Sequence, residues 1–240
     1  MSLWPPTRGC FVTGTDTEVG KTRVSAGLLH WFAAQGWRSA GLKPVAAGTE
    51  LINGERANED VRTLRAAASL PLTDAEICPF QFDAACAPHI AAALEGRVIE
   101  REPILQAARD LAARADALVV EGVGGFCVPL GPDWDTADLA QQLGLPVILV
   151  VGLRLGCISH ALLTAEAVRA RGLRLIGWIG NAIDPAMPWR DENIAYLRSR
   201  LAQQHGAPCL GIVPWLPQPD AAAVASQLDE AALRALFAQP

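Results

Sequence analysis

Apolar runs that suit buried strands alternate with helix-like stretches along the 240 residues of the chain. The predicted strands occupy residues 10–13, 39–45, 117–121, 146–151, 173–179 and 209–213. The predicted helices occupy residues 24–29, 62–69, 88–95, 103–115, 136–143, 157–171, 191–204 and 221–237. Nearly continuous apolar strands between helices are typical of a parallel sheet that is covered on both faces. Since no linker or internal repeat interrupts the pattern, it predicts a single α/β domain over residues 1–240.

The turn after the first predicted strand reads Gly-Thr-Asp-Thr-Glu-Val-Gly-Lys-Thr over residues 14–22. A strand, a glycine-containing turn and a helix that opens with Gly-Lys-Thr form the layout of a P-loop, whose backbone N–H groups bind phosphate. Lys21 is then expected to reach the β- and γ-phosphates, and the Thr22 hydroxyl to bind Mg²⁺. Five residues separate Gly14 from Gly20, one more than in the common pattern. The predicted fold class is therefore α/β, P-loop NTPase-like, with a mostly parallel central sheet and helices on both faces.

The composition is that of a well-buried globular protein, with 51% hydrophobic and 19% charged residues. A net charge of −5 and the lack of a long basic run argue against a nucleic-acid or anionic-membrane surface. No apolar run approaches the length of a transmembrane helix, and residues 1–6 lack the apolar segment of a signal peptide. The six cysteines are scattered without a metal-binding or disulfide pattern, so we expect reduced, mostly buried thiols in a cytoplasmic protein.

Polar residues at the ends of other predicted strands extend the candidate site, because ligands of parallel sheets bind at the carboxyl ends of the strands. Lys43 lies at the end of the second strand, and Pro44 fixes the turn that follows. Glu121 ends an apolar strand and is followed by glycines, an arrangement typical of a carboxylate that faces Mg²⁺. Glu59 and Asp60 are further carboxylate candidates, between which the residues alone do not decide. The pattern indicates a P-loop protein that uses Mg-ATP or Mg-GTP, and it leaves the acceptor open.

Several motifs from about residue 9 to 220 are similar to those of the dethiobiotin synthetase family, including the one-residue departure from the common P-loop. They are found at residues 14–22, 41–45, 87–90, 121–125, 146–152, 155–164, 177–181 and 212–216. The resemblance implies a cytoplasmic, homodimeric enzyme of biotin synthesis that uses Mg²⁺ and ATP. It would join 7,8-diaminononanoate to CO₂ or bicarbonate and close a ureido ring. The route implied passes through a carbamate and a carbamic–phosphoric anhydride, and it releases ADP and phosphate.

The resemblance also implies roles for individual residues, and it selects Asp60 over Glu59. The implied catalytic residues are Lys43, Lys21 and Thr17, and the implied metal ligands are Thr22, Asp60 and Glu121. The implied nucleotide-binding residues are Glu18, Val19, Gly20, Lys21, Thr22, Arg23, Asp60, Glu121, Gly122, Val123, Gly124, Asn181, Ala182, Pro214, Trp215 and Leu216. The implied substrate-binding residues are Thr17, Lys43, Ala47, Cys157, Ile158 and Ser159, and the substrate's distal carboxylate would come from the partner subunit.

Three of these positions carry a competing interpretation or depart from the family pattern. Asn181 would recognise adenine through its amide, whereas the residues alone favour a turn-forming asparagine before Asp184. Ala47 stands where the family usually has a hydroxyl residue, so a backbone group or a water would have to replace that contact. Ser159 stands where asparagine is common, at a helix N-terminus that a serine can still cap.

Three other functions remain open at this point. A ParA/MinD-like ATPase switch would carry an additional lysine early in the P-loop, and residues 14–17 contain none. A homologue that binds ATP without synthetase activity is the second, for which Ala47 is the only indication. A cobyrinate-type amidase is the third, and it would need a glutamine-handling domain for which the chain has no room.

Overall fold

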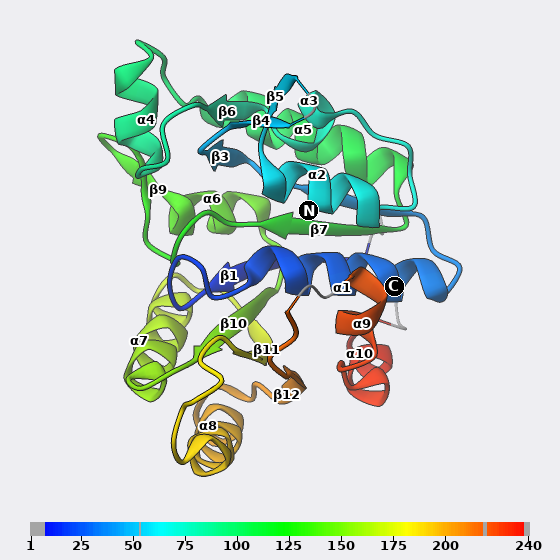
Figure 1. Ribbon diagram of the computed structural model, residues 1–240, viewed down its shortest axis with the longest axis vertical. Coiled ribbons are helices and arrows are strands. Elements are labelled where there is room, and N and C mark those ends of the chain that lie inside the picture. Colours follow the sequence, from blue (N-terminus) through cyan, green and yellow to red (C-terminus); the bar gives the residue numbers. More distant parts are fainter. Residues whose placement is uncertain (1–7, 53, 218–219, 238–240) are drawn as a thin grey trace.

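A six-stranded sheet runs through the computed structural model, which describes residues 8–52, 54–217 and 220–237 (Figure 1). Every pairing in this sheet is parallel. In spatial order its strands are β12 (Cys209–Val213), β11 (Leu175–Ala182), β10 (Val147–Leu153), β1 (Arg8–Gly14), β7 (Ala117–Glu121) and β2 (Ser39–Leu42). The parallel sheet expected from the apolar runs is thus confirmed. Residues 1–6, on which the signal-peptide expectation rests, lie outside the described residues.

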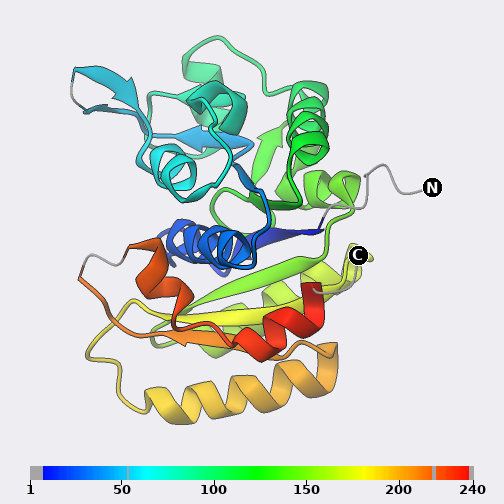
Figure 2. The same cartoon turned by 90° about the vertical axis from the view of Figure 1, so that its right-hand side faces the viewer.

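Helices cover both faces of the sheet. Right-handed crossovers require this arrangement, because connections that run in opposite directions along the strand order place their helices on opposite faces. α1 (Lys21–Ala34) packs against α2 (Glu59–Ala67) and α9 (Ala221–Ala225), whereas α7 (Cys157–Ala170) packs on β10 and α8 (Arg190–His205). In Figure 2, β10 and β11 run between α1 and α8. The other helices are α3 (Asp74–Ile77), α4 (Pro88–Leu94), α5 (Arg101–Arg114), α6 (Thr136–Leu143) and α10 (Glu230–Phe237). In the described parts of the chain, no helix combines the length and apolarity that a bilayer crossing requires.

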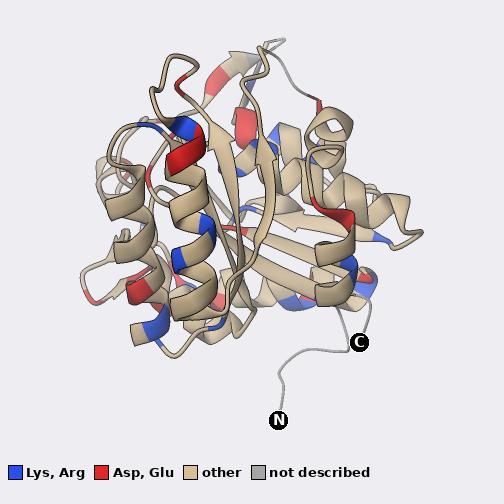
Figure 3. Ribbon diagram, turned by 90° about the horizontal axis from the view of Figure 1, so that it is seen from below, with Lys and Arg blue, Asp and Glu red and all other residues tan. Residues whose placement is uncertain are grey.

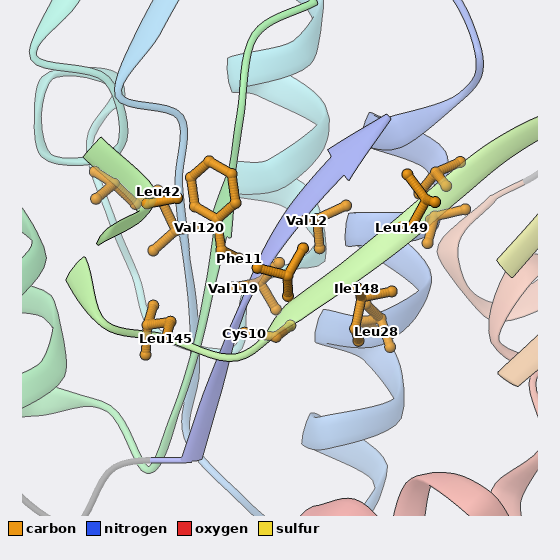
Figure 4. Packing of buried hydrophobic residues seen from close by; sticks show 14 of the residues in the cluster. Cys10, Phe11, Val12, Leu28, Leu42, Val119, Val120, Leu145, Ile148 and Leu149 are labelled. Carbon is orange, nitrogen blue, oxygen red and sulfur yellow. The ribbon is translucent and has the colours of Figure 1, made fainter. Parts of the chain in front are cut away.

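The core is built around β1, whose residues after Arg8 are all buried. Side chains of the neighbouring strands and of α1 pack around this strand (Figure 4). The labelled residues of this packing are Cys10, Phe11, Val12, Leu28, Leu42, Val119, Val120, Leu145, Ile148 and Leu149. Full burial of a Val, Leu or Phe side chain stabilises a fold by roughly 1.5–3 kcal/mol. The strand that leads into the P-loop is therefore held firmly at its base.

The second strand is shorter than predicted, because β2 ends at Leu42 instead of residue 45. The Lys43 N–H donates a hydrogen bond to the Ile77 carbonyl, and Pro44 has no N–H with which to continue the ladder. The chain therefore leaves the main sheet at Lys43. β3 (Val45–Ala47) then pairs in parallel with β6 (Phe80–Phe82) in a separate sheet. The turn that we predicted at Pro44 is what carries Lys43 out of the sheet.

Other differences from the sequence prediction concern short elements. The helix expected over residues 221–237 is broken into α9 and α10, because Leu228 forms a bridge with Gly211 and the Asp229 N–H bonds the Leu210 carbonyl. Two antiparallel hairpins were not predicted. They are β4 (Glu50–Ile52) with β5 (Glu55–Ala57), and β8 (Pro129–Gly131) with β9 (Trp134–Asp135).

The cysteines are all free, as expected, but only three of the six are buried. Burial raises the pKa of the Cys10 and Cys78 thiols to about 12, so both stay protonated and are poor nucleophiles. Acidic and basic residues are interspersed along the helices in the view of Figure 3.

Candidate active site

The P-loop joins β1 to α1 and leaves the N-terminus of that helix without a side-chain cap. Gly20 is the N-cap residue with φ 87°, and its helix has no acidic residue in the first turn. Glu18 also has a positive φ, of 59°. The first N–H groups of an α-helix have no partner within the helix and carry its positive dipole end. This arrangement suits a phosphate group at the start of α1.

Asn181 holds this loop from the neighbouring part of the sheet. It lies inside β11 and is only 4% exposed, so the alternative of a turn-forming asparagine is wrong. Its Nδ2 donates a hydrogen bond of 2.9 Å to the Val19 carbonyl. One donor of the amide is therefore used to fix the P-loop, and recognition of adenine by the same side chain stays a prediction.

Lys43 is the buried centre of an ionic cluster beside the loop, in which the Asp60 side chain is 42% exposed. Its Nζ lies 2.6 Å from Oε1 of Glu121 and 2.8 Å from Oδ2 of Asp60. The Thr22 hydroxyl donates to the same Glu121 oxygen at 2.7 Å. The Asn58 side chain caps α2, which places Asp60 in the first turn of that helix. Four separate segments thus converge on one point, as expected for residues at the carboxyl ends of parallel strands.

Burial and charge determine the ionisation of this cluster. The Lys43 side chain is 3% exposed and that of Glu121 is 0% exposed. Burial alone lowers the pKa of Lys43, but the attraction of Glu121 and Asp60 outweighs it and raises that pKa above its ordinary value. Burial likewise raises the pKa of Asp60, but the Lys43 ammonium lowers it by more. Lys43 and Asp60 are therefore both charged at neutral pH.

Lys21 occupies a different position from Lys43. Its Nζ donates a hydrogen bond of 2.9 Å to the Asp16 carbonyl within the P-loop. Burial, together with the nearby Lys43 ammonium, lowers the pKa of Lys21 to about 8. A phosphate group next to this ammonium would favour its charged form. The two lysines therefore differ in their partners, because Lys21 bonds the P-loop backbone and Lys43 bonds two carboxylates.

The residues around Glu121 fit a hard divalent cation. Oε2 of Glu121 is buried and accepts no hydrogen bond from the described residues, so it is free to bind a cation. Thr22 and Asp60 add a hydroxyl and a carboxylate, and such oxygen donors are those that Mg²⁺ prefers. No cluster of three or more His, Cys, Asp or Glu side chains suited to a metal occurs in the described residues. The remaining ligands would have to be phosphate oxygens and water, which is usual for Mg²⁺.

The other predicted P-loop and glycine-loop residues lie around this cluster. Thr17 is exposed near the tip of the loop, and a Cβ atom built on Gly124 would lie 3.6 Å from its hydroxyl. The Gly122 N–H bonds the Val12 carbonyl, which keeps the glycines next to the P-loop. Val123 is half-buried there, while Glu18 and Arg23 are exposed.

Other predicted residues are not joined to the cluster by any hydrogen bond among the described residues. Ala182 is buried at the end of β11, and residues 214–216 follow β12, with Trp215 49% exposed. Ala47 ends β3 and pairs with Phe82. Their proposed contacts would be made through the nucleotide or the substrate.

The predicted substrate residues Cys157, Ile158 and Ser159 form the first turn of α7. Gly156 is the N-cap of this helix with φ 93°, and no side chain caps it. Our expectation that Ser159 caps the helix is therefore wrong, because that residue lies inside the first turn with an exposed side chain. The uncapped N–H groups fit an anion, as the resemblance implies.

Comparison with known proteins assigns the chain to a family. A family model described as an AAA domain matches residues 8–223. The ATP-dependent dethiobiotin synthetase BioD of Ralstonia nicotianae is 57% identical over 226 residues, which cover 94% of this chain and 97% of the relative. The chain belongs to the dethiobiotin synthetase family. This confirms the resemblance drawn from the motifs.

Solved structures of distant proteins share the fold. The MinD cell division protein of Aquifex aeolicus has a TM-score of 0.50 at 14% identity, covering 96% of this chain and 94% of that one. A ParA family ATPase from Chlorobium tepidum has a TM-score of 0.50 at 13% identity, covering 95% and 92%. At such identities the likeness concerns the fold alone, and it confirms the P-loop NTPase-like class. Membership of the synthetase family does not favour the ATPase-switch alternative.

The structure contains an ion pair between Asp16 and Arg154 that was not predicted from the sequence. Arg154 donates from Nη2 to Oδ2 of Asp16, whose Oδ1 accepts the Thr17 N–H at 2.8 Å. The carbonyl of Asp16 holds Lys21, so this one residue contacts both neighbours that the resemblance places in catalysis. Arg154 comes directly after β10, and the strand-end rule that found Lys43 could have found it too. Its partner, however, lies 138 residues away in sequence.

Arg154→Ala is expected to lower kcat/KM about tenfold while changing the free energy of unfolding by less than ~1 kcal/mol. The two side chains are 42% and 46% exposed, and such pairs contribute little to stability. Their geometric effect is larger, because a small displacement of Thr17 and Lys21 misplaces the reacting groups. Steady-state kinetics and thermal unfolding would be measured on Arg154→Ala and on Arg154→Lys, which keeps the charge and should recover most activity. A lower Tm with unchanged kinetics would show that the pair is only structural.

Proposed function

We propose that the protein closes the ureido ring of dethiobiotin from 7,8-diaminononanoate and CO₂, with ATP converted to ADP and phosphate. The observation that carries this proposal is the 57% identity over nearly the whole length of a relative named ATP-dependent dethiobiotin synthetase. The ionic cluster of Lys43, Glu121 and Asp60 beside the P-loop supports it, because the reaction joins several anions at one place. The protein is then an ATP-dependent cyclo-ligase.

The reaction proceeds in three steps, none of which needs a covalent enzyme nucleophile. One amine of the substrate attacks CO₂, forms a C–N bond and releases a proton, which leaves a carbamate. A carbamate oxygen then attacks the γ-phosphorus, and the bond from that phosphorus to ADP breaks. The second amine attacks the carbonyl carbon of the resulting anhydride, forms a C–N bond and loses a proton, while the C–O bond to phosphate breaks and the ring closes. Catalysis of such phosphoryl transfer consists mainly of positioning and charge stabilisation.

Lys21 and Lys43 are proposed to supply that charge stabilisation. The γ-phosphate and the carbamate are both anions and repel each other unless cations lie between or beside them. Lys43, buried at the end of β2, would face this space from one side, and Lys21, bonded within the P-loop, would face it from another. Thr17, at the tip of the loop, would hydrogen-bond the carbamate.

Thr22, Asp60 and Glu121 are proposed to hold Mg²⁺. When bound, the ion would neutralise charge on the β- and γ-phosphates of ATP. The buried, unpartnered Oε2 of Glu121 supports this assignment. The nucleotide would be bound by residues of the P-loop, of the glycine loop after β7 and of the ends of β11 and β12, as the family resemblance implies: Glu18, Val19, Gly20, Lys21, Thr22, Arg23, Gly122, Val123, Gly124, Asn181, Ala182, Pro214, Trp215 and Leu216.

The substrate's distal carboxylate is proposed to bind at the uncapped N-terminus of α7, at Cys157, Ile158 and Ser159, across the interface of a homodimer. Ala47 would contribute a backbone group where relatives use a hydroxyl.

We also propose that residues 1–240 form one domain and that the enzyme works in the cytoplasm. Sedimentation analysis tests the dimer, and a fully active monomer of 25.4 kDa would contradict it.

The proposed activity is tested by incubating the protein with 7,8-diaminononanoate, bicarbonate, ATP and MgCl₂ and measuring dethiobiotin by mass spectrometry. We expect dethiobiotin and ADP in equal amounts, and no ADP when the diamine is omitted. ATP turnover that is independent of the diamine would instead indicate an ATPase switch. Binding of ATP without turnover in the complete mixture would indicate a homologue without synthetase activity.

A further inference from the structure

Lysine is confined to the proposed active site of this chain. Of the 20 basic residues, only Lys21 and Lys43 are lysines, and the other 18 are arginines. Both lysines are buried, and among the described residues only Lys43 of the two bonds carboxylates. A lysine ammonium is a compact point charge, unlike the planar and more extended guanidinium of arginine. Lys43 therefore resembles a small cation in both charge and size at the point where it lies.

Lys43 contacts the carboxylates of two residues that are proposed to bind Mg²⁺, and the Oε2 atom of Glu121 proposed for the ion belongs to the same carboxylate that it bonds. Its ammonium bridges Oε1 of Glu121 and Oδ2 of Asp60, at 2.6 and 2.8 Å, and the Thr22 hydroxyl donates to the same Glu121 oxygen. A divalent ion bound to these three residues would lie within a few ångströms of the ammonium. Two cations at that distance in a buried site repel each other strongly, because little water screens them.

We propose that Lys43 and the metal ion occupy this cluster alternately. In the metal-free protein the Lys43 ammonium neutralises Glu121 and Asp60, and metal binding displaces it and frees it for the phosphate and carbamate anions. This inference rests on the metal ligands of the proposed function. The Lys43 contact neutralises a 0%-exposed glutamate, and an unpaired buried carboxylate would be strongly destabilising. It also makes release of the lysine depend on the metal.

The wild-type protein offers a direct test, because lysine labelled at Cε with ¹³C gives signals from only two side chains. Lys21→Arg assigns them, since the one remaining signal belongs to Lys43. Titration of the nucleotide-free protein with MgCl₂ is expected to shift the Lys43 signal saturably, and the Lys21 signal far less. Saturable metal binding that leaves the Lys43 signal in place would overturn the proposal, because both cations would then be present together.

A second test measures metal affinity directly. Mn²⁺ binding without nucleotide, followed by electron paramagnetic resonance, is expected to be at least ~10-fold tighter in Lys43→Met than in the wild type, because the competing charge is gone. Lys43→Arg keeps a cation and should bind Mn²⁺ no more tightly than the wild type. Equal or weaker binding by Lys43→Met would overturn the proposal. Lys43→Met should be purified with MgCl₂ and its fold checked by circular dichroism; if it does not fold, the wild-type titration decides.

Failure of this inference and failure of the proposed function are distinguishable. If the protein forms dethiobiotin but its Lys43 signal does not change when metal binds, the proposed function is supported and the alternate occupancy of the cluster is contradicted. If metal binding shifts the Lys43 signal but the protein makes no dethiobiotin, the alternate occupancy is supported and the proposed function is contradicted.

Discussion

Lys43→Ala is expected to lower the turnover of dethiobiotin synthesis by about 10²–10⁴-fold while leaving nucleotide affinity within a few-fold of the wild type. The ammonium bonds Glu121 and Asp60, and among the described residues it makes no hydrogen bond to the P-loop backbone. Its loss removes the charge that lets the carbamate approach the γ-phosphate, but it leaves the N-terminus of α1 unchanged. Turnover would be measured by mass spectrometry of dethiobiotin, and affinity by calorimetry with a non-hydrolysable ATP analogue.

Lys21→Ala provides the matched control, because both lysines are buried and only their contacts differ. Lys21 bonds the P-loop carbonyl of Asp16, so its removal should weaken nucleotide binding as well as turnover. Lys43→Ala leaves Glu121 buried without a cation, which costs about 3–5 kcal/mol of folding stability. Both variants should therefore be assayed with saturating MgCl₂ and a verified fold. Wild-type turnover by Lys43→Ala would remove this residue from the mechanism.

The parts of the site that are local in sequence could be predicted from it. The P-loop is one continuous stretch between an apolar strand and a helix, so its residues carry their own context. Lys43 and Glu121 were found because strand ends of a parallel sheet share one edge. That rule requires only the positions of the strands, and the error of three residues at the end of β2 did not affect it.

The contacts that depend on strand order could not be predicted. β10 lies beside β1 with Gly14 opposite Val150, and this register brings Arg154 next to Asp16. β11 lies beside β10, and this places Asn181 against the P-loop. Apolar runs show that strands exist, but all buried strands have nearly the same composition, so the order of their pairing is not encoded locally.

The choice between Glu59 and Asp60 is another feature of the site that the residues alone could not decide. Both follow Asn58, the N-cap of α2, and both lie in the first helical turn. Glu59 is exposed, whereas Asp60 reaches Lys43. Neighbours on a helix differ in direction by about 100°. Which of the two faces the site is decided by how α2 packs on α1, and only the folded structure shows that packing.

Gly20→Ala is expected to abolish tight nucleotide binding, with at least a hundredfold loss of affinity, or about 2.7 kcal/mol. A Cβ atom at this position would lie 2.1 Å from Nδ2 of Asn181. Asn181 cannot move aside easily, because it is 4% exposed and bonded to the Val19 carbonyl. The P-loop backbone must shift instead, and its N–H groups then no longer converge on the phosphates. Calorimetry with a non-hydrolysable ATP analogue measures the loss.

Gly36→Ala separates this contact from simple backbone strain. Gly36 follows α1 with φ 80°, close to the 87° of Gly20, and apart from its chain neighbours no atom of the described residues lies within 4 Å of a Cβ built there. Both substitutions carry the cost of placing alanine in the left-handed region, about 1–2 kcal/mol. Only Gly20→Ala also drives the loop away from Asn181. Backbone strain should therefore lower the Tm of both variants, whereas nucleotide affinity should fall in Gly20→Ala alone. Equal affinities in the two variants would show that the contact between Gly20 and Asn181 does not shape the phosphate site.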